Sequence, residues 1–413
     1  MAAPNKDFLN LNLQGSIPRL QDYSVSPTLG FMRENPLHKL PEYFDPWWKI
    51  VTRIPELVED GTLRDEVTKM PFLDYRKLDG EPEWRLGHVV LSAITQTYVW
   101  VAGEKHIPLS LPKNLAVPYW EISKLLGITP SCCHFNSILE NWMLVDPDGL
   151  MVVDNFKPIV NFVGGDDQVW FFMVNAQTEM DCGPALCGIV EAQQAVKGLD
   201  VNAYIAALEK VEKAVRRMKV SLSRMRERCR PWVFYNVIRP YFAGWDSPAF
   251  KAKGWKGLIY EGVSPDPLCY GGGSAAQSVT LPSLDAGLGI IHQPEEKNAC
   301  NNFQKQMLPQ HREFVKALAD GPSIRHFATF SKNSRALRVY NACLQAVTDF
   351  RSYHIQIVTE YVIIPSHQKD INQNFSHQAA LGTGGTGFMT FLKNMRSSIT
   401  NAFCRIDEGT EIN

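Results

Sequence analysis

Helical periodicity dominates this chain from Pro130 onward, and it limits the folds that the chain can adopt. Apolar residues recur at steps of three and four residues along eight segments, and only about 151–163 alternates like a short pair of strands. A doubly wound sheet needs strands that alternate with helices, and no such alternation is present. The pattern predicts a mainly α protein that builds its site between facing helices. The predicted helices span about 134–145, 168–198, 200–229, 231–243, 276–290, 310–331, 335–364 and 386–404.

The N-terminal part of the chain has a different organisation. Residues 1–44 are rich in proline and polar side chains and predict a loose arm. Helical patterns follow at 46–57 and 84–100, and three prolines between 103 and 118 then break the periodicity. We therefore expect three parts: an N-terminal arm at 1–44, a small helical domain at 45–118 and a large helical domain at 119–413.

Charge and hydropathy exclude several classes of function. Lys and Arg total 42 against 43 for Asp and Glu, so the net charge of −1 argues against nucleic acid as a partner. The first seven residues, Met-Ala-Ala-Pro-Asn-Lys-Asp, lack the apolar run of a signal peptide, and no stretch approaches the ~20 continuous apolar residues of a membrane span. We expect a cytoplasmic protein without a membrane segment.

The predicted helix 335–364 carries an imidazole and a guanidinium one turn apart on a largely apolar background. Read at helical spacing, one face carries Val347, Phe350, His354, Val358 and Tyr361. A haem iron binds one neutral imidazole nitrogen, and Arg351 is placed to pair with a haem propionate. A single histidine on an apolar face is more often a core residue than a ligand, so this helix alone leaves both interpretations open.

The cysteines add one constraint on such a haem. There are nine, an odd number without a CxxC pair, which predicts reduced thiols. The sequence Cys132-Cys133-His134 is not the CxxCH of covalent haem attachment. Any haem is therefore expected to be held without a covalent bond.

Three further motifs accompany this helix. They are Phe234-Tyr235-Asn236-Val237-Ile238-Arg239, Gly272-Gly273-Ser274-Ala275-Ala276-Gln277-Ser278 and Gly382-Thr383-Gly384-Gly385-Thr386. In this order, and at these spacings to His354, they resemble the indoleamine 2,3-dioxygenase family, haem enzymes that open the indole ring of tryptophan with O2. The resemblance extends from about Leu20 to Ser398, with shorter matches such as Leu115-Ala116-Val117-Pro118-Tyr119.

The resemblance implies a fold, a reaction and a set of partners. The fold would be two-lobed and helical, with haem b between helices of the large lobe. The reaction would be insertion of O2 across the indole C2–C3 bond of L-tryptophan to give N-formylkynurenine, the first step of the kynurenine pathway of tryptophan catabolism. The partners would be L-tryptophan or a related indoleamine, O2 and an external electron donor, and the chain would act as a monomer.

The resemblance also assigns roles to individual residues. His354 would be the proximal ligand of the haem iron, and the cofactor would further contact Arg351, Gly273, Ser274 and Asp285, with Asp285 as a partner of Arg351. The catalytic set would be Phe234 against the indole, Arg239 on the substrate carboxylate, which a planar guanidinium suits, and Ser274. The substrate pocket would add Phe171, Phe172, Ala275 and Thr383.

Each of these residues also has a structural interpretation. The three phenylalanines Phe171, Phe172 and Phe234 can belong to the core, and Arg239 can be a surface charge near a helix end. Ser274 and Thr383 can be helix N-caps. The glycine-rich turn around Thr383 satisfies GxGxxG, but polar residues precede it and only 26 residues follow Gly387, so it does not predict a dinucleotide site.

Three pocket positions depart from the family pattern. Asn175 stands where a small hydroxyl residue is usual, and His134 and Ser137 stand where a tyrosine and a cysteine are usual. These residues predict a more polar distal pocket. The functional interpretation is a changed substrate preference or an extra hydrogen bond to O2, and the alternative is drift at positions without a chemical requirement.

Two other functions compete with the dioxygenase. Some molluscan proteins of this fold are O2-binding myoglobins, but an oxygen carrier has no need for the amino-acid clamp of Phe234, Arg239 and Thr383. Short tyrosine-based signalling patterns surround Tyr119 and Tyr260. Patterns of six residues arise often by chance, so signalling is the weaker of the two alternatives.

Overall fold

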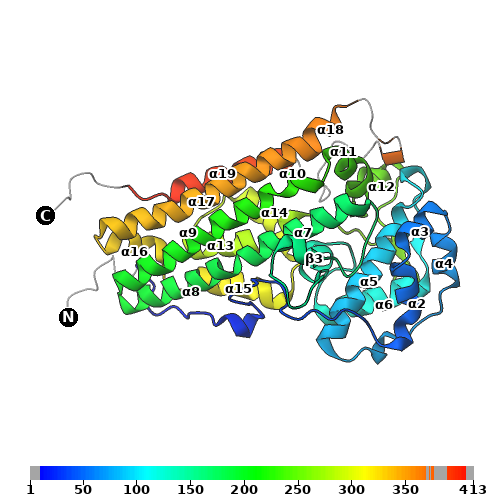
Figure 1. Ribbon diagram of the computed structural model, residues 1–413, viewed down its shortest axis with the longest axis horizontal. Helices are drawn as coiled ribbons and strands as arrows, with labels where there is room; N and C mark the ends of the chain where they lie inside the picture. Colours follow the sequence, from blue (N-terminus) through cyan, green and yellow to red (C-terminus); the bar gives the residue numbers. More distant parts are fainter. Residues whose placement is uncertain (1–9, 369–371, 373, 376–387, 406–413) are drawn as a thin grey trace.

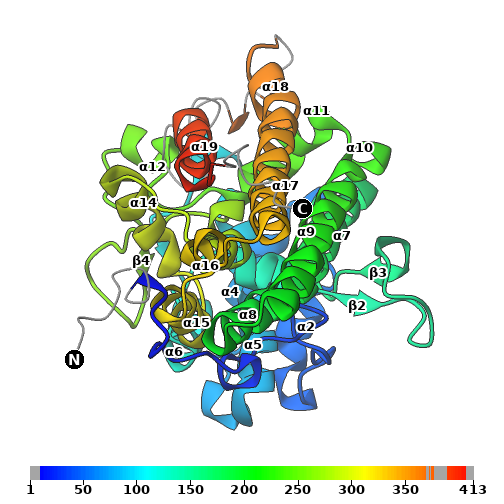
Figure 2. The same cartoon turned by 90° about the vertical axis from the view of Figure 1, so that its left-hand side faces the viewer.

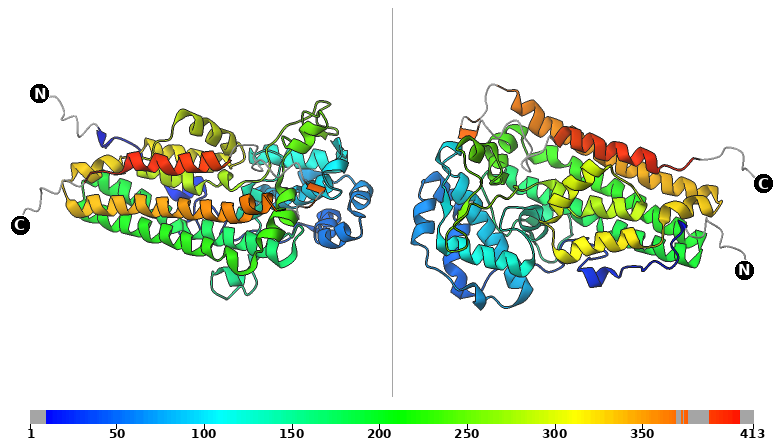
Figure 3. Two further views of the ribbon diagram at one scale, coloured as in Figure 1. Left: turned by 90° about the horizontal axis from the view of Figure 1, so that it is seen from above. Right: turned by 180° about the vertical axis from the view of Figure 1, so that it is seen from behind.

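The computed structural model describes residues 10–368, 372, 374, 375 and 388–405, and this part of the chain is mainly helical (Figure 1). Four long helices run along the long axis of the molecule (Figures 1 and 3). Helix α9 is central, because it packs against the other three. The four are α7 (Gly165–Asp181), α8 (Gly183–Gly198), α9 (Val201–Ser223) and α17 (Ser334–Val358). The predicted mainly α fold is confirmed.

Local signals explain where two of these helices begin. Asp200 caps α9, accepting hydrogen bonds from the backbone N–H groups of Asn202 and Ala203 at 3.0 Å each. Asn333 caps α17 in the same way, through Arg335 and Ala336. The capped helices then bury the apolar faces that the periodicity predicted.

Two of the predicted helices are each broken into a pair. The segment 168–198 forms α7 and α8, because Pro184 cannot continue the hydrogen-bond pattern of α7. The segment 310–331 forms α15 (Pro309–Asp320) and α16 (Ile324–Phe330), separated at Gly321 and restarted by the N-cap Ser323. At the first break Cys182 keeps right-handed helical dihedral angles, so α8 continues along the bundle from the end of α7 (Figure 1).

Irregular turns replace three more of the predicted helical stretches. The segment 134–145 forms a π-helical turn at Phe135–Leu139 and the short strand β2 (Met143–Leu144) in place of a helix. A second π-helical turn, Phe234–Ile238, follows α11 (Pro231–Val233), and the 3-10 helix Arg239–Phe242 comes after it. A third, Thr359–Ile363, continues α17 into α18 (Ile364–Ser366). Turns of this kind occur often at functional sites, and all three adjoin the cavity described below.

A second group of helices lies at one end of the bundle (Figure 1). Its centre is α5 (Gly80–Trp100), which packs against α2 (Asp45–Val51), α4 (Leu63–Lys69) and α6 (Lys113–Leu126). Gln96 and Trp100 of α5 donate side-chain hydrogen bonds at 2.7 and 3.0 Å to the carbonyl of Ala243. This contact joins the two groups of helices. The division of the chain at residue 118 stays a prediction.

The N-terminal segment is not loose in its described part. Leu11, Phe31 and Met32 are almost fully buried. The carbonyl of Leu11 accepts a hydrogen bond from the Ser323 N–H at 2.9 Å, and the Phe31 ring lies 4.9 Å from that of His311. Composition predicted a loose arm, but these apolar side chains fix residues 10–44 to the large group of helices.

Strands are short. The antiparallel pair β2 (Met143–Leu144) and β3 (Phe156–Lys157) forms a projecting hairpin (Figure 2), so the predicted pair at 151–163 supplies only one of its two strands. A parallel pair joins β1 (Ser110–Leu111) and β4 (Ile259–Tyr260). The remaining helices are α3 (Ile54–Glu59), α10 (Met225–Arg228), α12 (Pro248–Ala252), α13 (Thr280–Leu288), α14 (Pro294–Gln304) and α19 (Phe388–Ser397).

Candidate functional site

A cavity of about 310 Å³ lies inside the large group of helices, between α7, α9, α17, α19 and the loop before α13. Most of its wall is apolar, and a few polar side chains interrupt it. Eleven of the residues predicted from the sequence line it: His134, Ser137, Phe171, Asn175, Phe234, Arg239, Gly273, Ser274, Ala275, Arg351 and His354. Thr383 lies outside the described residues.

The face of α17 that carries His354 turns toward this cavity. Phe350, His354 and Val358 line it together with Tyr361, as their helical spacing predicted, while Val347 is fully buried outside it. Burial, and to a smaller extent the nearby charge of Arg351, lowers the pKa of His354 to about 4. The imidazole is therefore neutral at neutral pH, which is the form that binds a metal ion.

Arg351 forms a buried ion pair one turn before His354. Its Nη2 donates to Oδ2 of Asp285 at 2.6 Å, and its Nη1 donates to the carbonyl of Met395 at 2.8 Å. His292 contacts the same carboxylate oxygen through Nε2 at 2.8 Å. Burial alone would raise the pKa of Asp285, but Arg351 and His292 lower it. Asp285 does not line the cavity itself, and it contacts Arg351 as expected.

Aromatic rings form one side of the cavity. The ring of Phe171 lies 4.8 Å from that of Phe234 and 5.9 Å from that of Phe242, and Tyr361 meets Phe234 edge to face at 5.9 Å. Such stacked and edge-on pairs hold each other in place. Arg239 is buried beside them, with its guanidinium 5.3 Å from the ring centre of Tyr235. Burial lowers the pKa of Arg239.

Phe172 differs from the expectation, because it is not among the residues that line the cavity. It is fully buried and packs against Phe162 and Phe242 at 5.7 and 6.0 Å. Successive residues of an α-helix point about 100° apart, so Phe171 and Phe172 face different surroundings. Phe172 supports the wall from behind.

The loop before α13 packs closely against the backbone near Phe242. A Cβ atom on Gly272 would lie 1.9 Å from the carbonyl oxygen of Phe242, so only glycine permits this approach. Ser274 then caps a short 3-10 helix, Ala275–Gln277, by accepting from the Ala276 N–H at 3.2 Å. The N-cap interpretation of Ser274 is confirmed, and the same residue lines the cavity.

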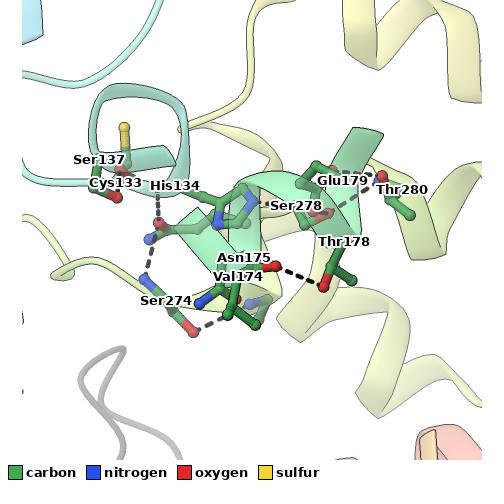
Figure 4. A network of polar contacts seen from close by, with 12 residues as sticks. Cys133, His134, Ser137, Val174, Asn175, Thr178, Glu179, Ser274, Ser278 and Thr280 are labelled. Carbon is green, nitrogen blue, oxygen red and sulfur yellow. Dashed lines mark hydrogen bonds and ion pairs between the residues drawn. The ribbon is translucent and has the colours of Figure 1, made fainter. Parts of the chain in front are cut away.

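A polar cluster surrounds the carboxylate of Glu179 on α7 (Figure 4). Its Oε1 lies 3.0 Å from Nε2 of His134 and accepts from Ser278 Oγ at 2.6 Å, while Oε2 accepts from Thr280 Oγ1 at 2.6 Å. Burial would raise the pKa of Glu179, but His134 and the two hydroxyls together lower it. A buried, ionised carboxylate therefore stands at the cavity wall.

Sequence reasoning missed two members of the site. Glu179 stands four residues after Asn175 and eight after Phe171, so helical spacing places all three on one face and was a usable signal. His292 lies in the loop between α13 and α14, where no periodicity indicates its contact with Asp285.

Tyr119 and Tyr260 are both fully buried. The Tyr260 hydroxyl donates to the carbonyl of Pro130 at 2.6 Å. A kinase cannot reach either hydroxyl in the folded chain, which argues against signalling through these motifs. All nine cysteines lie in the described part of the chain, and each is a free thiol. Within that part, no helix combines the length and the apolar character that crossing a membrane requires.

Comparison with known proteins places this site in a family. The family model for indoleamine 2,3-dioxygenase matches residues 19–402. Human indoleamine 2,3-dioxygenase 2 is 36% identical over 396 residues, covering 93% of this chain and 96% of that protein. Indoleamine 2,3-dioxygenase 1 of Rattus norvegicus is 36% identical over 94% of this chain and 97% of its own length, and a myoglobin of Haliotis madaka is 33% identical over 92% and 97%. The chain belongs to the indoleamine 2,3-dioxygenase family.

Proposed function

We propose that this protein is a haem dioxygenase that converts L-tryptophan and O2 to N-formylkynurenine. Both oxygen atoms enter the product as the indole C2–C3 bond breaks, so the reaction consumes no external electrons in each turnover. The observation that carries the proposal is the family match over residues 19–402. An external electron donor is required only to keep the iron ferrous. The free thiols support a reducing compartment such as the cytoplasm.

The residues around the cavity fit haem b. His354 offers a neutral imidazole nitrogen at an apolar wall, and Arg351 offers a buried cation for a propionate. Asp285 holds Arg351 in position through the 2.6 Å ion pair, and the backbone at Gly273 and Ser274 lines the same space. When bound, the haem would supply the iron chemistry that makes O2 reactive toward an electron-rich indole.

The other residues would bind and orient the substrate. Arg239 would pair with the substrate carboxylate, and its burial strengthens a charge-assisted bond because water is excluded. Phe171 and Phe234, whose rings pack tilted against each other, would contact the indole and fix its plane. The reaction needs no acid–base pair from the protein, so positioning by these side chains is the main contribution of the chain.

The alternative is reversible O2 binding, which the similarity to a Haliotis myoglobin raises. The buried Arg239 favours the dioxygenase, since an oxygen carrier gains nothing from a cation placed for a carboxylate. The human and rat relatives named as dioxygenases, at 36% identity, are also slightly more similar to this chain than the myoglobin at 33%.

One assay separates the two functions. The purified chain, loaded with haem b and supplied with a reductant and L-tryptophan under air, should form N-formylkynurenine, followed by its absorbance. His354→Ala should lose the haem absorbance and the activity together, whereas Ser283→Ala, a buried substitution on α13 outside the cavity wall, should retain both. A haem-loaded parent that binds O2 without forming kynurenine would contradict the proposal and support the carrier.

A further inference from the structure

The polar residues at the His134 end of the cavity have a shared property. Two hydroxyls there, those of Ser137 and Thr178, use their protons on backbone carbonyl oxygens, which can only accept. Ser137 Oγ donates to the carbonyl of Cys133 at 2.8 Å, and Thr178 Oγ1 donates to the carbonyl of Val174 at 2.8 Å. What Ser137 and Thr178 present to the cavity is therefore the lone pairs of their oxygens.

The same argument fixes the imidazole of His134. Its Nε2 faces the Glu179 carboxylate, whose lowered pKa keeps it ionised and able only to accept (Figure 4). Nε2 therefore donates to this carboxylate, and the contact fixes the orientation of the ring. Among the described residues no group hydrogen-bonds to Nδ1, and the ring lines the cavity.

Asn175 completes this wall. A backbone carbonyl cannot donate, so the contact of 2.7 Å with Phe171 O must come from the amide nitrogen of Asn175. The side chain keeps Oδ1 and a second N–H for the cavity. The wall of His134, Ser137, Asn175 and Thr178 thus presents acceptor oxygens of Ser137, Thr178 and Asn175 together with an N–H donor of Asn175.

The position of this wall relates it to the proposed substrate. Phe171, Asn175 and Glu179 occupy successive turns of α7 along the cavity. The Phe171 ring packs tilted against that of Phe234, which stands five residues before Arg239. A substrate held by its carboxylate at Arg239 and by its ring at Phe171 would therefore extend the far edge of the indole along α7 toward Asn175.

We propose that this wall selects an indole that carries a hydroxyl group on its benzene ring. A hydroxyl matches the wall because it donates to one of the acceptors and accepts from Asn175, whereas a bare C–H edge leaves these groups without partners. The proposal rests on the proposed dioxygenase function and names its substrate class. Glu179 acts as a positioning residue, because its contact with Nε2 fixes the orientation of the His134 ring.

The test compares substrates of similar size at a single pH. The probes are L-tryptophan, 5-hydroxy- and 6-hydroxy-L-tryptophan, and 5-methyl- and 6-methyl-L-tryptophan, whose methyl groups match the hydroxyl in size without a donor. We expect kcat/KM for at least one hydroxyl compound to exceed that of its methyl partner about tenfold, as one well-placed hydrogen bond predicts.

Variants then assign the preference to the wall. His134→Phe combined with Asn175→Leu should reduce the hydroxyl-to-methyl ratio to about one. Ser137→Ala, which keeps the cavity shape, should reduce it about threefold if its oxygen takes part. Ser283→Ala is the matched control: it loses the same kind of bond, from Oγ to the carbonyl of Val279 at 2.9 Å, but does not line the cavity, so its ratio should not change.

The outcomes separate this proposal from the dioxygenase function. Equal kcat/KM for both pairs in the parent, or a ratio that survives in the double variant and in Ser137→Ala, overturns the selective wall while leaving the dioxygenase intact. If no indole is turned over, the dioxygenase proposal fails. Dissociation constants of the same compounds, measured by calorimetry, then show whether the wall prefers the hydroxyl compounds. A tenfold tighter hydroxyl compound supports it, and equal affinities overturn it.

Discussion

Removal of the Asp285 carboxylate tests how the buried cation Arg351 is held. Asp285 and Arg351 have side chains that are each only 5% exposed, and the carboxylate accepts from Arg351 at 2.6 Å and from His292 at 2.8 Å. Among the described residues, Asp285→Ala would leave the Arg351 guanidinium with the Met395 carbonyl as its hydrogen-bond partner. Breaking a buried pair from one side costs about 3–5 kcal/mol, because the remaining charge stays buried without compensation.

This cost converts to a shift in melting temperature. The unfolding entropy is about 2.1 cal/mol/K per residue, so a chain of 413 residues that unfolds in one step has about 0.9 kcal/mol/K. Asp285→Ala should therefore lower Tm by about 3–6 °C, measured by circular dichroism in samples of equal haem content. Asp349→Ala is the control, since Asp349 meets Arg216 at 3.8 Å and is 34% exposed, and its Tm should change by about 1 °C or less.

A double variant separates the charge from the packing. Asp285→Leu with Arg351→Met replaces both charges by apolar groups of similar size, which is often neutral for a buried pair. The double variant should be clearly more stable than Asp285→Leu alone. A Tm of Asp285→Ala within about 1 °C of the parent, or a double variant less stable than either single one, would refute the reasoning.

Three further predictions concern the cavity. Arg239→Ala should raise KM for L-tryptophan about ten- to a hundredfold in steady-state kinetics without loss of haem absorbance, and unchanged kinetics would place the carboxylate elsewhere. Phe171→Ala should lower kcat by loosening the indole, and an unaltered kcat would reject that role. Glu179→Gln should lower Tm at neutral pH and flatten its fall in acid. The pKa of Glu179 in the folded chain lies below its ordinary value of 4.5. Ionisation of Glu179 therefore stabilises the parent fully above about pH 4.5, and this stabilisation is lost as the pH falls through the folded pKa. Parallel Tm profiles of parent and variant would contradict this prediction.

Periodicity predicted the fold class and one face of the site. The spacing of Phe350, His354 and Val358 placed them on one side of a helix, and the structure turns that side toward the cavity. Periodicity was less reliable for helix ends. Pro184 was a visible signal for the break between α7 and α8, but apolar residues on both sides keep the same period across it. The structure differs from the predicted loose arm for a related reason. Composition does not show that Leu11 and Phe31 pack against other segments that bury them.

Contacts between distant segments set the limit of sequence reasoning at the site. Asp285 was expected beside Arg351 only because the chain resembles a family, and no pattern within the helices links residues 66 positions apart. Phe171 and Phe172 look equivalent in the sequence, and only packing decides that the first lines the cavity.

The departures from the family pattern show most clearly why composition is an insufficient guide to a pocket. His134, Ser137 and Asn175 make the pocket more polar, as the sequence predicted, but polarity alone does not distinguish donors from acceptors. That distinction depends on which protons the neighbours already use: Cys133 O takes that of Ser137, Phe171 O takes one from Asn175, and Glu179 accepts from Nε2 of His134. Two of these partners are backbone carbonyls, and the third is a carboxylate 45 residues from His134 in the sequence. A comparison of side chains position by position cannot reveal them. The pocket can offer a ligand only those hydrogen-bond donors and acceptors that the folded protein has not already paired.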